Sequence, residues 1–285
     1  MEIKEIRIED EKYPNQLKEI KNPPNKIFLV GNEKILQSDG IAVIGSRCNT
    51  EYGEKYATKF SKELAKQGLT IISGMAVGID GFAHKGALSV GGKTIAVLGS
   101  GFNNIYPEEN KELFKQIIEN DGAIITEYEP DVKPNSENFP KRNRIVSGLS
   151  KGVLVIEAVY RSGTSITAKL AQSQGRKVFC IPSNLERKNG VGTNQLIKEG
   201  ASLVTNIDDI LNAIKVERKA ENNAVKIPAE YLPIYEVLED EPMNVNVICK
   251  KLKTDISSIN ANLMLMELEG YIKSLPGNYY EKAEL

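Results

Sequence analysis

Short apolar runs alternate with amphipathic stretches along the first three quarters of the chain. Six runs are almost continuously apolar: residues 41–45, 69–73, 94–99, 123–126, 153–158 and 177–182. Continuous apolar character is typical of parallel strands, because helices cover both faces of such a sheet. The segments between the runs, 52–68, 79–91, 108–120 and 165–175, have the spacing of amphipathic helices. This alternation predicts an α/β domain over residues 41–214, with a doubly wound, mostly parallel, Rossmann-like sheet.

The segments on either side of this domain have different patterns. Residues 1–40 form a short lead-in that contains a helix, a Pro-Pro break and a strand within residues 13–32. Residues 215–226 are polar and predict a linker. Helices are then predicted at 228–239, 245–253 and 255–269, followed by two short strands around a Pro-Gly-Asn turn. This order predicts a small winged-helix-like domain over residues 227–285.

Composition narrows the class of protein. The 285 residues are 41% hydrophobic and 26% charged, and no apolar run reaches the ~20 residues of a membrane span. The N-terminal residues lack the apolar core of a signal peptide. Three scattered cysteines and one histidine argue against a disulfide framework or a metal site. We expect a cytoplasmic protein with no membrane contact, no metal and no cofactor.

Polar loops follow several of the predicted strands. Parallel strands end at one edge of the sheet, so the loops after them converge, and ligands bind there. The loops and the stretch "FPKRNRIVSGLS" (139–150) bring Gly45, Ser46, Arg47, Gly74, Phe139, Lys141, Arg142, Asn143, Arg144, Arg161, Ser162, Gly163 and Thr164 to this edge. An anion site is predicted at this edge, because it gathers glycine amides, hydroxyls, helix starts and four of the eight arginines. Each feature alone is also typical of tight turns or of a solvated face, and an aromatic residue such as Phe139 fits a core position better than a base-stacking one.

Two catalytic motifs match as letters but not in context. Residues 87–94 resemble a phosphate-binding loop, but the predicted helix precedes them and the strand follows, which is the reverse of the required order. Residues 148–152 fit the pattern of a serine nucleophile, again after a helix and before a strand. Neither motif therefore predicts catalysis.

Several ordered motifs resemble one known family. These are "VIGSR" (43–47), "SGMAVGIDGFAH" (73–84), "FPKRNRIVSGLS" (139–150), "VIEAVYRSGTSITA" (155–168) and "GTNQLIKEGA" (192–201). In order and spacing they resemble the bacterial DNA-processing protein A family. The resemblance implies an extended Rossmann fold that binds single-stranded DNA and forms a homodimer. It also implies a role without catalysis, in which the protein protects incoming DNA and helps to load the RecA recombinase during natural transformation.

The same resemblance implies which residues bind DNA. Carried over by position, the pocket comprises Gly45 to Arg47, Lys141 to Arg144 and Ser162 to Thr164, with Lys169 nearby. Backbone phosphates would make binding salt-dependent and nearly indifferent to sequence, and Phe139 would stack on a base.

Two other hypotheses remain at this stage. A nucleotide-binding or nucleotide-hydrolysing enzyme would use a similar glycine-rich edge, with Glu157 as general acid or base. A winged-helix regulator would read DNA through its third helix, but residues 255–270 contain three acids and no cation. Residues 225–285 hold 6 lysines, no arginine and 10 acids, which favours contact with a protein over contact with DNA.

Overall fold

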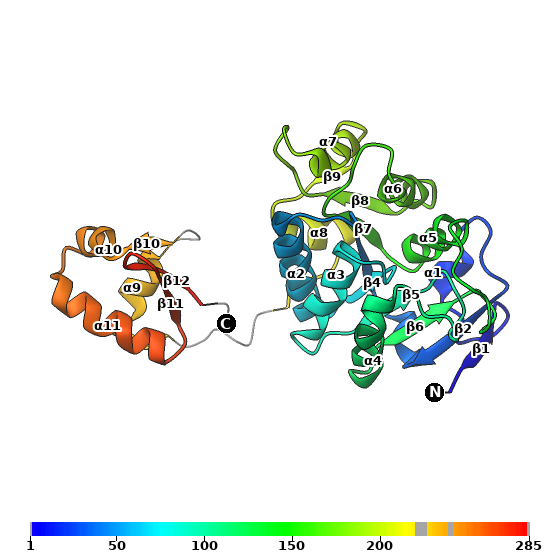
Figure 1. The fold of residues 1–285 in the computed structure, drawn as a ribbon, viewed down its shortest axis with the longest axis horizontal. Coiled ribbons are helices and arrows are strands. Elements are labelled where there is room, and N and C mark those ends of the chain that lie inside the picture. Colours follow the sequence, from blue (N-terminus) through cyan, green and yellow to red (C-terminus); the bar gives the residue numbers. More distant parts are fainter. Residues whose placement is uncertain (1, 220–226, 239–241, 284–285) are drawn as a thin grey trace. The chain divides into compact units, whose positions relative to one another are not determined.

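A nine-stranded sheet organises the first of the two units into which the computed structural model divides, Met1–Lys219 and Ala220–Leu285 (Figure 1). The structure describes residues 2–219, 227–238 and 242–283. The strands of this sheet are β1 (Lys4–Arg7), β2 (Lys26–Gly31), β3 (Gly40–Ile44), β4 (Thr70–Ser73), β5 (Thr94–Val97), β6 (Ala123–Thr126), β7 (Gly152–Val155), β8 (Lys177–Cys180) and β9 (Ser202–Leu203). Their order across the sheet is β1-β2-β6-β5-β4-β3-β7-β8-β9.

The sheet is parallel from β6 to β9, as the apolar runs predict. Residues 1–40 do more than lead into it, because they contribute β2, antiparallel to β6, and β1, antiparallel to β2. The apolar run of β2, "KIFLVG", is buried over its four central residues and extends the core. The lead-in is therefore part of the first unit.

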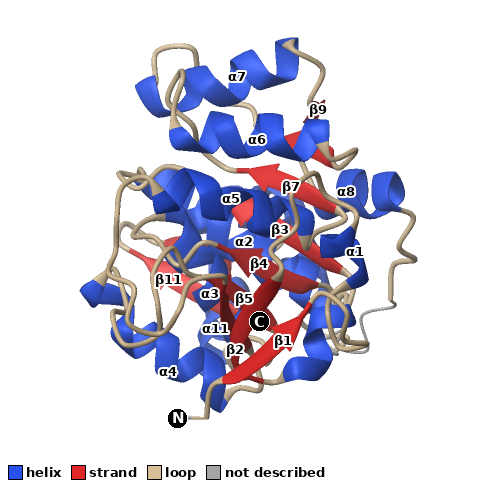
Figure 2. Cartoon of the chain, turned by 90° about the vertical axis from the view of Figure 1, so that its right-hand side faces the viewer, coloured by secondary structure: helices blue, strands red, loops and turns tan. Residues whose placement is uncertain are grey.

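Helices cover both faces of the sheet (Figures 1 and 2). They are α1 (Asn15–Lys18), α2 (Glu51–Lys66), α3 (Ile79–Leu88), α4 (Lys111–Glu119), α5 (Asn138–Gly148), α6 (Gly163–Ser173), α7 (Val191–Lys198) and α8 (Ile207–Ile214). Side chains alternate along each strand. In β3, Ile41 and Val43 pack against α2, α3 and α8, whereas Ala42 and Ile44 share a core with α1, α5, α6 and α7. Burial on both faces explains the continuous apolar runs.

The first unit extends beyond α8 into the predicted linker 215–226. Lys219 donates its backbone N–H to the Gln67 side chain at 2.7 Å, and Val216 packs on the core beneath α2 and α8. Residues 220–226 lie outside the described residues.

The second unit has the three helices and the C-terminal hairpin that the sequence predicts, with one additional short strand before the second helix. It contains α9 (Leu232–Val237), α10 (Val245–Leu252) and α11 (Ile256–Leu268), with a three-stranded sheet of β10 (Met243–Asn244), β12 (Tyr279–Lys282) and β11 (Ile272–Leu275). Gly277 and Asn278 turn the hairpin through positive φ angles of 85° and 60°. The expected helix at 228–239 is shorter, and residue 239 lies outside the described residues.

Candidate functional site

The central crevice lies where the winding of the chain changes direction. From β3 the chain proceeds through β4, β5 and β6 on one side, whereas β7, β8 and β9 lie on the other side of β3. The loops after β3 and β7 therefore diverge, and open α/β sheets bind ligands at such a point. A cavity of about 280 Å³ opens here between the ends of these two strands.

Nine of the fourteen predicted site residues line this crevice. They are Gly45, Ser46, Arg47, Gly74, Arg142, Asn143, Ser162, Gly163 and Thr164. Phe139 lines an adjoining cavity of about 510 Å³. Lys141, Arg144, Arg161 and Lys169 line neither cavity. The sequence thus locates the crevice, and contact of these residues with DNA stays a prediction.

The start of α6 forms one wall of the crevice. Ser162 is its N-cap and accepts a hydrogen bond from the backbone N–H of Ser165 at 3.4 Å. Thr164 donates its hydroxyl to the carbonyl of Gly45 at 3.0 Å, which ties the loop after β7 to the loop after β3. A Cβ added to Gly163 would meet nothing within 4 Å, so the backbone there is open. Backbone N–H groups at a helix start favour an anion.

Residue 74 has to be glycine, because two buried charged side chains lie directly against it. An added Cβ would lie 2.6 Å from a guanidinium nitrogen of Arg142 and 2.7 Å from a carboxylate oxygen of Asp80. The Asp80 carboxylate accepts the backbone N–H groups of Gly74 and Ala76 at 3.1 and 3.4 Å. Burial raises the pKa of Asp80, and the Arg142 charge opposes this shift. Asp80 therefore shapes the loop after β4.

Arg142 belongs to the floor of the crevice and is only 3% exposed. Its Nη1 donates to the carbonyls of Gly74 and Val97, at the ends of β4 and β5, and its Nε donates to Asn143 at 3.2 Å. Burial lowers the pKa of Arg142 to about 10, so the guanidinium remains charged at neutral pH. The sequence predicts a phosphate contact, but these hydrogen bonds commit the side chain to the strand ends.

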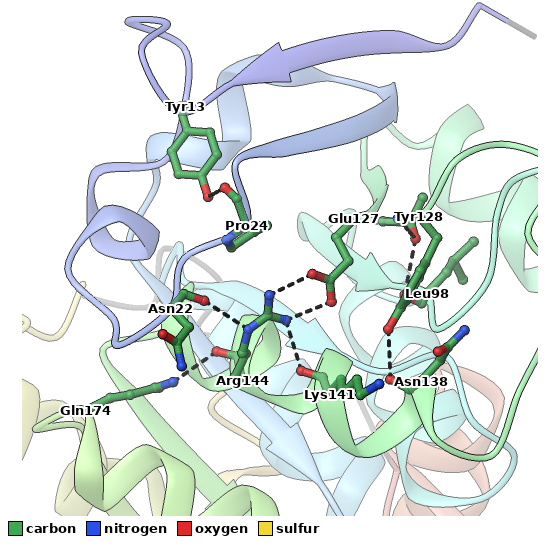
Figure 3. A network of polar contacts seen from close by, with 11 residues as sticks. Tyr13, Asn22, Pro24, Leu98, Glu127, Tyr128, Asn138, Lys141, Arg144 and Gln174 are labelled. Atoms are coloured by element: carbon green, nitrogen blue, oxygen red, sulfur yellow. Dashed lines mark hydrogen bonds and ion pairs between the residues drawn. The ribbon is translucent and has the colours of Figure 1, made fainter.

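Arg144 is also committed to partners within the protein (Figure 3). Its guanidinium donates to both carboxylate oxygens of Glu127, at 2.7 and 2.6 Å, and to the carbonyls of Asn22 and Lys141, each at 3.0 Å. Burial works against the charged form, but the hydrogen bond to Glu127 and the charge of its carboxylate outweigh burial and raise the pKa of Arg144. Gln174 donates to the Arg144 carbonyl at 3.1 Å. The network joins α5 to the lead-in and to α6.

Four of the predicted cations are exposed. They are Arg47, Lys141, Arg161 and Lys169. Arg47 lies over the Phe139 ring, 5.3 Å from its centroid, and Arg161 lies over the neighbouring Tyr160 ring at 5.2 Å. Lys141 approaches Glu137 at 3.9 Å, but both side chains are about two thirds exposed or more. An anion in solution can reach all four cations.

Tyr106 is a site residue that the sequence reasoning missed. It lines the adjoining cavity with Phe139, and the two ring centroids are 5.6 Å apart. A signal was available, because the loop that contains Tyr106 follows a predicted strand at the same edge of the sheet.

The residues that an enzyme would need have structural roles. Glu157 accepts the backbone N–H and the hydroxyl of Thr50, at 3.0 and 2.5 Å, and Thr50 is the N-cap of α2. His84 is fully buried, and its Nδ1 contacts the Thr94 hydroxyl at 2.6 Å. Burial lowers the pKa of His84 to about 3. Neither side chain lines the crevice.

Within the part of the chain that the structure describes, no group of three or more His, Cys, Asp or Glu side chains is arranged to hold a metal ion. Among the same residues, no helix has the length and apolar character needed to cross a membrane.

The fold is a Rossmann-like α/β domain followed by a winged-helix domain. Residues 4–215 match the model of the DNA recombination-mediator protein A family, and residues 218–278 match the DprA winged helix domain. The chain belongs to the DNA recombination-mediator protein A family. The predicted family, fold class and recombination-mediator role are thereby confirmed.

Relatives with known sequences or structures agree with this assignment. The chain is 41% identical to Protein Smf of Escherichia coli over 96% of its own length and 76% of the relative. The structure of DNA processing protein A from Streptococcus pneumoniae matches with a TM-score of 0.71 and 41% identity, over 77% of this chain and 76% of that one. The Helicobacter pylori protein, described for its single-stranded DNA binding mode, matches with a TM-score of 0.67 and 33% identity, over 75% and 97%.

Proposed function

We propose that this protein binds single-stranded DNA at the crevice between β3 and β7 and catalyses no reaction there. The observation that carries the proposal is the combination of exposed Arg47 with open backbone at Gly163 and the start of α6 around one cavity. These groups suit the phosphate of a nucleic acid backbone. The Helicobacter pylori relative, described as binding single-stranded DNA, supports the same reading.

A strand of DNA fits the distribution of positive charge around the crevice better than a single mononucleotide does. Arg142 and Arg144 are held by internal partners, which leaves the exposed cations Arg47, Lys141 and Arg161 for a DNA strand. Arg47 lines the crevice, whereas the other two lie outside it on α5 and on the loop before α6. A single phosphate needs one or two such donors, but a repeating backbone can meet several.

The contacts of the candidate acid and base support the proposal that the protein catalyses no reaction. The Glu157 carboxylate caps α2 through Thr50, and His84 is buried beside Thr94. A general acid or base must reach the proton that it transfers. Neither group reaches the crevice, so the nucleotide-hydrolysing alternative loses its candidate residues.

The resemblance to the family extends the proposal to partners. We propose that the protein forms a homodimer in the cytoplasm, protects incoming single strands and passes them to the RecA recombinase during natural transformation. Family membership supports these steps. The second unit, with no arginine and a net negative charge over residues 225–285, is expected to contact protein and not phosphate. Light scattering would test the dimer, and RecA filament assembly on single strands would test the transfer.

One set of measurements tests the central claim. Fluorescence anisotropy with single-stranded and double-stranded oligonucleotides of equal length should give tighter binding of the single strand. Its affinity should fall as salt rises, with a slope of about −0.7 per phosphate contacted. Incubation with nucleoside triphosphates should give no hydrolysis. Equal binding of both DNA forms, or nucleotide turnover that Glu157→Gln abolishes, would contradict the proposal.

A further inference from the structure

The cavity of about 510 Å³ adjoins the crevice but differs from it in chemistry. Four residues line both: Arg47, Gly74, Ala76 and Arg142. The remaining wall is made by Val77, Tyr106, Pro107, Glu108, Glu109 and Phe139. Its volume lies within the range of about 300–1,000 Å³ that small-molecule sites occupy. Because the two cavities share a wall, a nucleotide with its phosphate in the crevice can place its base in the second cavity.

Tyr106 presents an aromatic ring to this cavity. It is 46% exposed, and its ring is tilted by 40° to that of Phe139. Phe139 is the less exposed of the two, because it also packs on Gly99, where an added Cβ would lie 2.7 Å from the ring. Arg47 lies over the same ring. Phe139 therefore supports Tyr106, and Tyr106 is the ring that a base can stack on.

The two carboxylates in the wall suit a base and not a phosphate. Glu108 forms an ion pair with Lys111 at 3.1 Å. Glu109 is exposed and forms no ion pair with any residue that the structure describes. An ionised carboxylate repels phosphate and accepts hydrogen bonds only. Its partner in this cavity is therefore a hydrogen-bond donor, and the N–H groups of a nucleobase are such donors.

We propose that the cavity is a nucleobase subsite in which Tyr106 stacks on the base and Glu109 accepts hydrogen bonds from guanine, so that guanine is favoured over thymine. The inference rests on the proposed binding of single-stranded DNA. Guanine carries an N1–H beside its N2 amino group, and this pair of donors matches the two oxygens of a carboxylate. Thymine carries one N–H between two carbonyl oxygens, which the carboxylate repels. The subsite adds a modest base preference to a site that otherwise binds the backbone.

Three labelled oligonucleotides of equal length test the subsite with the full-length chain. One contains thymine only, the second has isolated guanines, and the third has abasic sites at the guanine positions. Wild-type protein should bind the guanine oligonucleotide about fivefold more tightly than the thymine one, as one additional hydrogen bond allows. Tyr106→Ala should weaken binding of the guanine oligonucleotide about tenfold, in keeping with the loss of one stacked base. Its effect on the abasic oligonucleotide should be small.

Variants separate stacking, base selection and phosphate binding. Tyr106→Phe should bind like wild type, because the ring is kept, and Glu109→Gln should reduce the preference for guanine. Tyr279→Ala, which removes a tyrosine that is 43% exposed in the second unit, and Glu119→Gln on α4 are matched controls. None of these changes should alter the salt dependence, because none removes a phosphate contact.

Each contrary result has a distinct meaning. Wild-type protein that binds all three oligonucleotides equally would overturn the subsite and leave the proposed function standing. A Glu109→Gln protein with an unchanged guanine preference would overturn the role of Glu109. Wild-type protein that binds no single strand at all would overturn the proposed function, and the subsite with it.

Discussion

Arg144 and Glu127 form a two-pronged ion pair between α5 and the segment that follows β6, with N–O distances of 2.7 and 2.6 Å (Figure 3). The side chains are 20% and 16% exposed, so the pair is largely shielded from water. The arginine also donates to the carbonyl of Asn22 in the lead-in. Arg144 thus anchors the helix that carries Lys141 and Arg142 towards the site.

Arg144→Ala should lower the free energy of unfolding by about 2–3 kcal/mol, because it leaves the Glu127 carboxylate shielded and without its partner. Urea denaturation would measure the loss. Arg218→Ala is a matched control, because its ion pair with Asp208 is about half exposed and should contribute at most about 1 kcal/mol. If Arg144→Ala were as stable as wild type and flattened the salt slope of DNA binding by about 0.7, the arginine would serve DNA instead.

Arg142→Lys should destabilise the protein further, by about 3 kcal/mol or more. An ammonium group lacks the planar fork that donates to Gly74, Val97 and Asn143 together, and the buried charge would remain. Thermal unfolding at neutral pH would measure the change. The salt slope of DNA binding should stay that of wild type in whatever fraction remains folded. A stable variant with a slope reduced by about 0.7 would restore the phosphate contact that the sequence predicts.

The strands and the position of the site could be predicted from the sequence because both depend on local patterns. β3 and β7 are continuous apolar runs, and a loop with polar residues begins within a few residues of the end of each. β1 was missed because only one of its four residues, Ile6, is buried, so the strand has no apolar run. It is a strand because it pairs with β2.

The roles of individual cations could not be predicted, because their partners are distant in the sequence. Arg142 and Arg144 look alike in the stretch "KRNR". Their partners are the carbonyls of Gly74 and Val97 and the carboxylate of Glu127, which only the folded chain brings to them. A run of cationic residues therefore predicts where positive charge is concentrated. It does not predict which of the cationic side chains is available to a ligand.

Arg47→Ala should weaken binding of single-stranded DNA and flatten its salt slope by about 0.7, because Arg47 is the exposed cation in the wall of the crevice. Stability should change by no more than about 0.5 kcal/mol, since the side chain is on the surface. Arg7→Ala is the matched control, because it also removes one arginine. Arg7 lies on β1 at the edge of the sheet and is 68% exposed. Anisotropy titrations at several salt concentrations would compare the two. Equal slopes in both variants would show that Arg47 meets no phosphate.

Glu157→Gln should lower the free energy of unfolding by about 1–2 kcal/mol and leave DNA affinity nearly unchanged. The amide keeps one acceptor for Thr50 but turns an N–H₂ group towards its other donor, which weakens the start of α2. Denaturant unfolding and anisotropy on the same preparation would separate the two effects. A large loss of DNA affinity at unchanged stability would place Glu157 in the binding site.

The single histidine gives the fold a defined response to acid. The Thr94 hydroxyl donates to the carbonyl of Ile71 at 2.7 Å, so the 2.6 Å contact with His84 requires the imidazole to donate from Nδ1. Nε2 is then the unprotonated nitrogen, and it has no hydrogen-bond partner among the described residues. Burial, assisted by the Arg142 charge, lowers the pKa of His84 to about 3, whereas an unfolded chain holds it near 6.5.

Between about pH 6.5 and pH 3 the unfolded state therefore binds a proton at His84 that the folded state does not bind. The free energy of unfolding should fall as the pH drops below about 6.5. At pH 5 the loss from His84 should be about 2 kcal/mol, from 1.36 kcal/mol per pH unit. His84→Met, which keeps the volume but cannot titrate, should match wild type within about 1 kcal/mol at pH 7 and exceed it at pH 5. Asp80, whose pKa burial raises, acts in the opposite sense in both proteins, so the comparison cancels its contribution. Urea unfolding of the two proteins from pH 7 to pH 5 would measure the difference. Parallel curves would mean that His84 is protonated in the folded state, and that its environment is more polar than its burial beside Thr94 indicates.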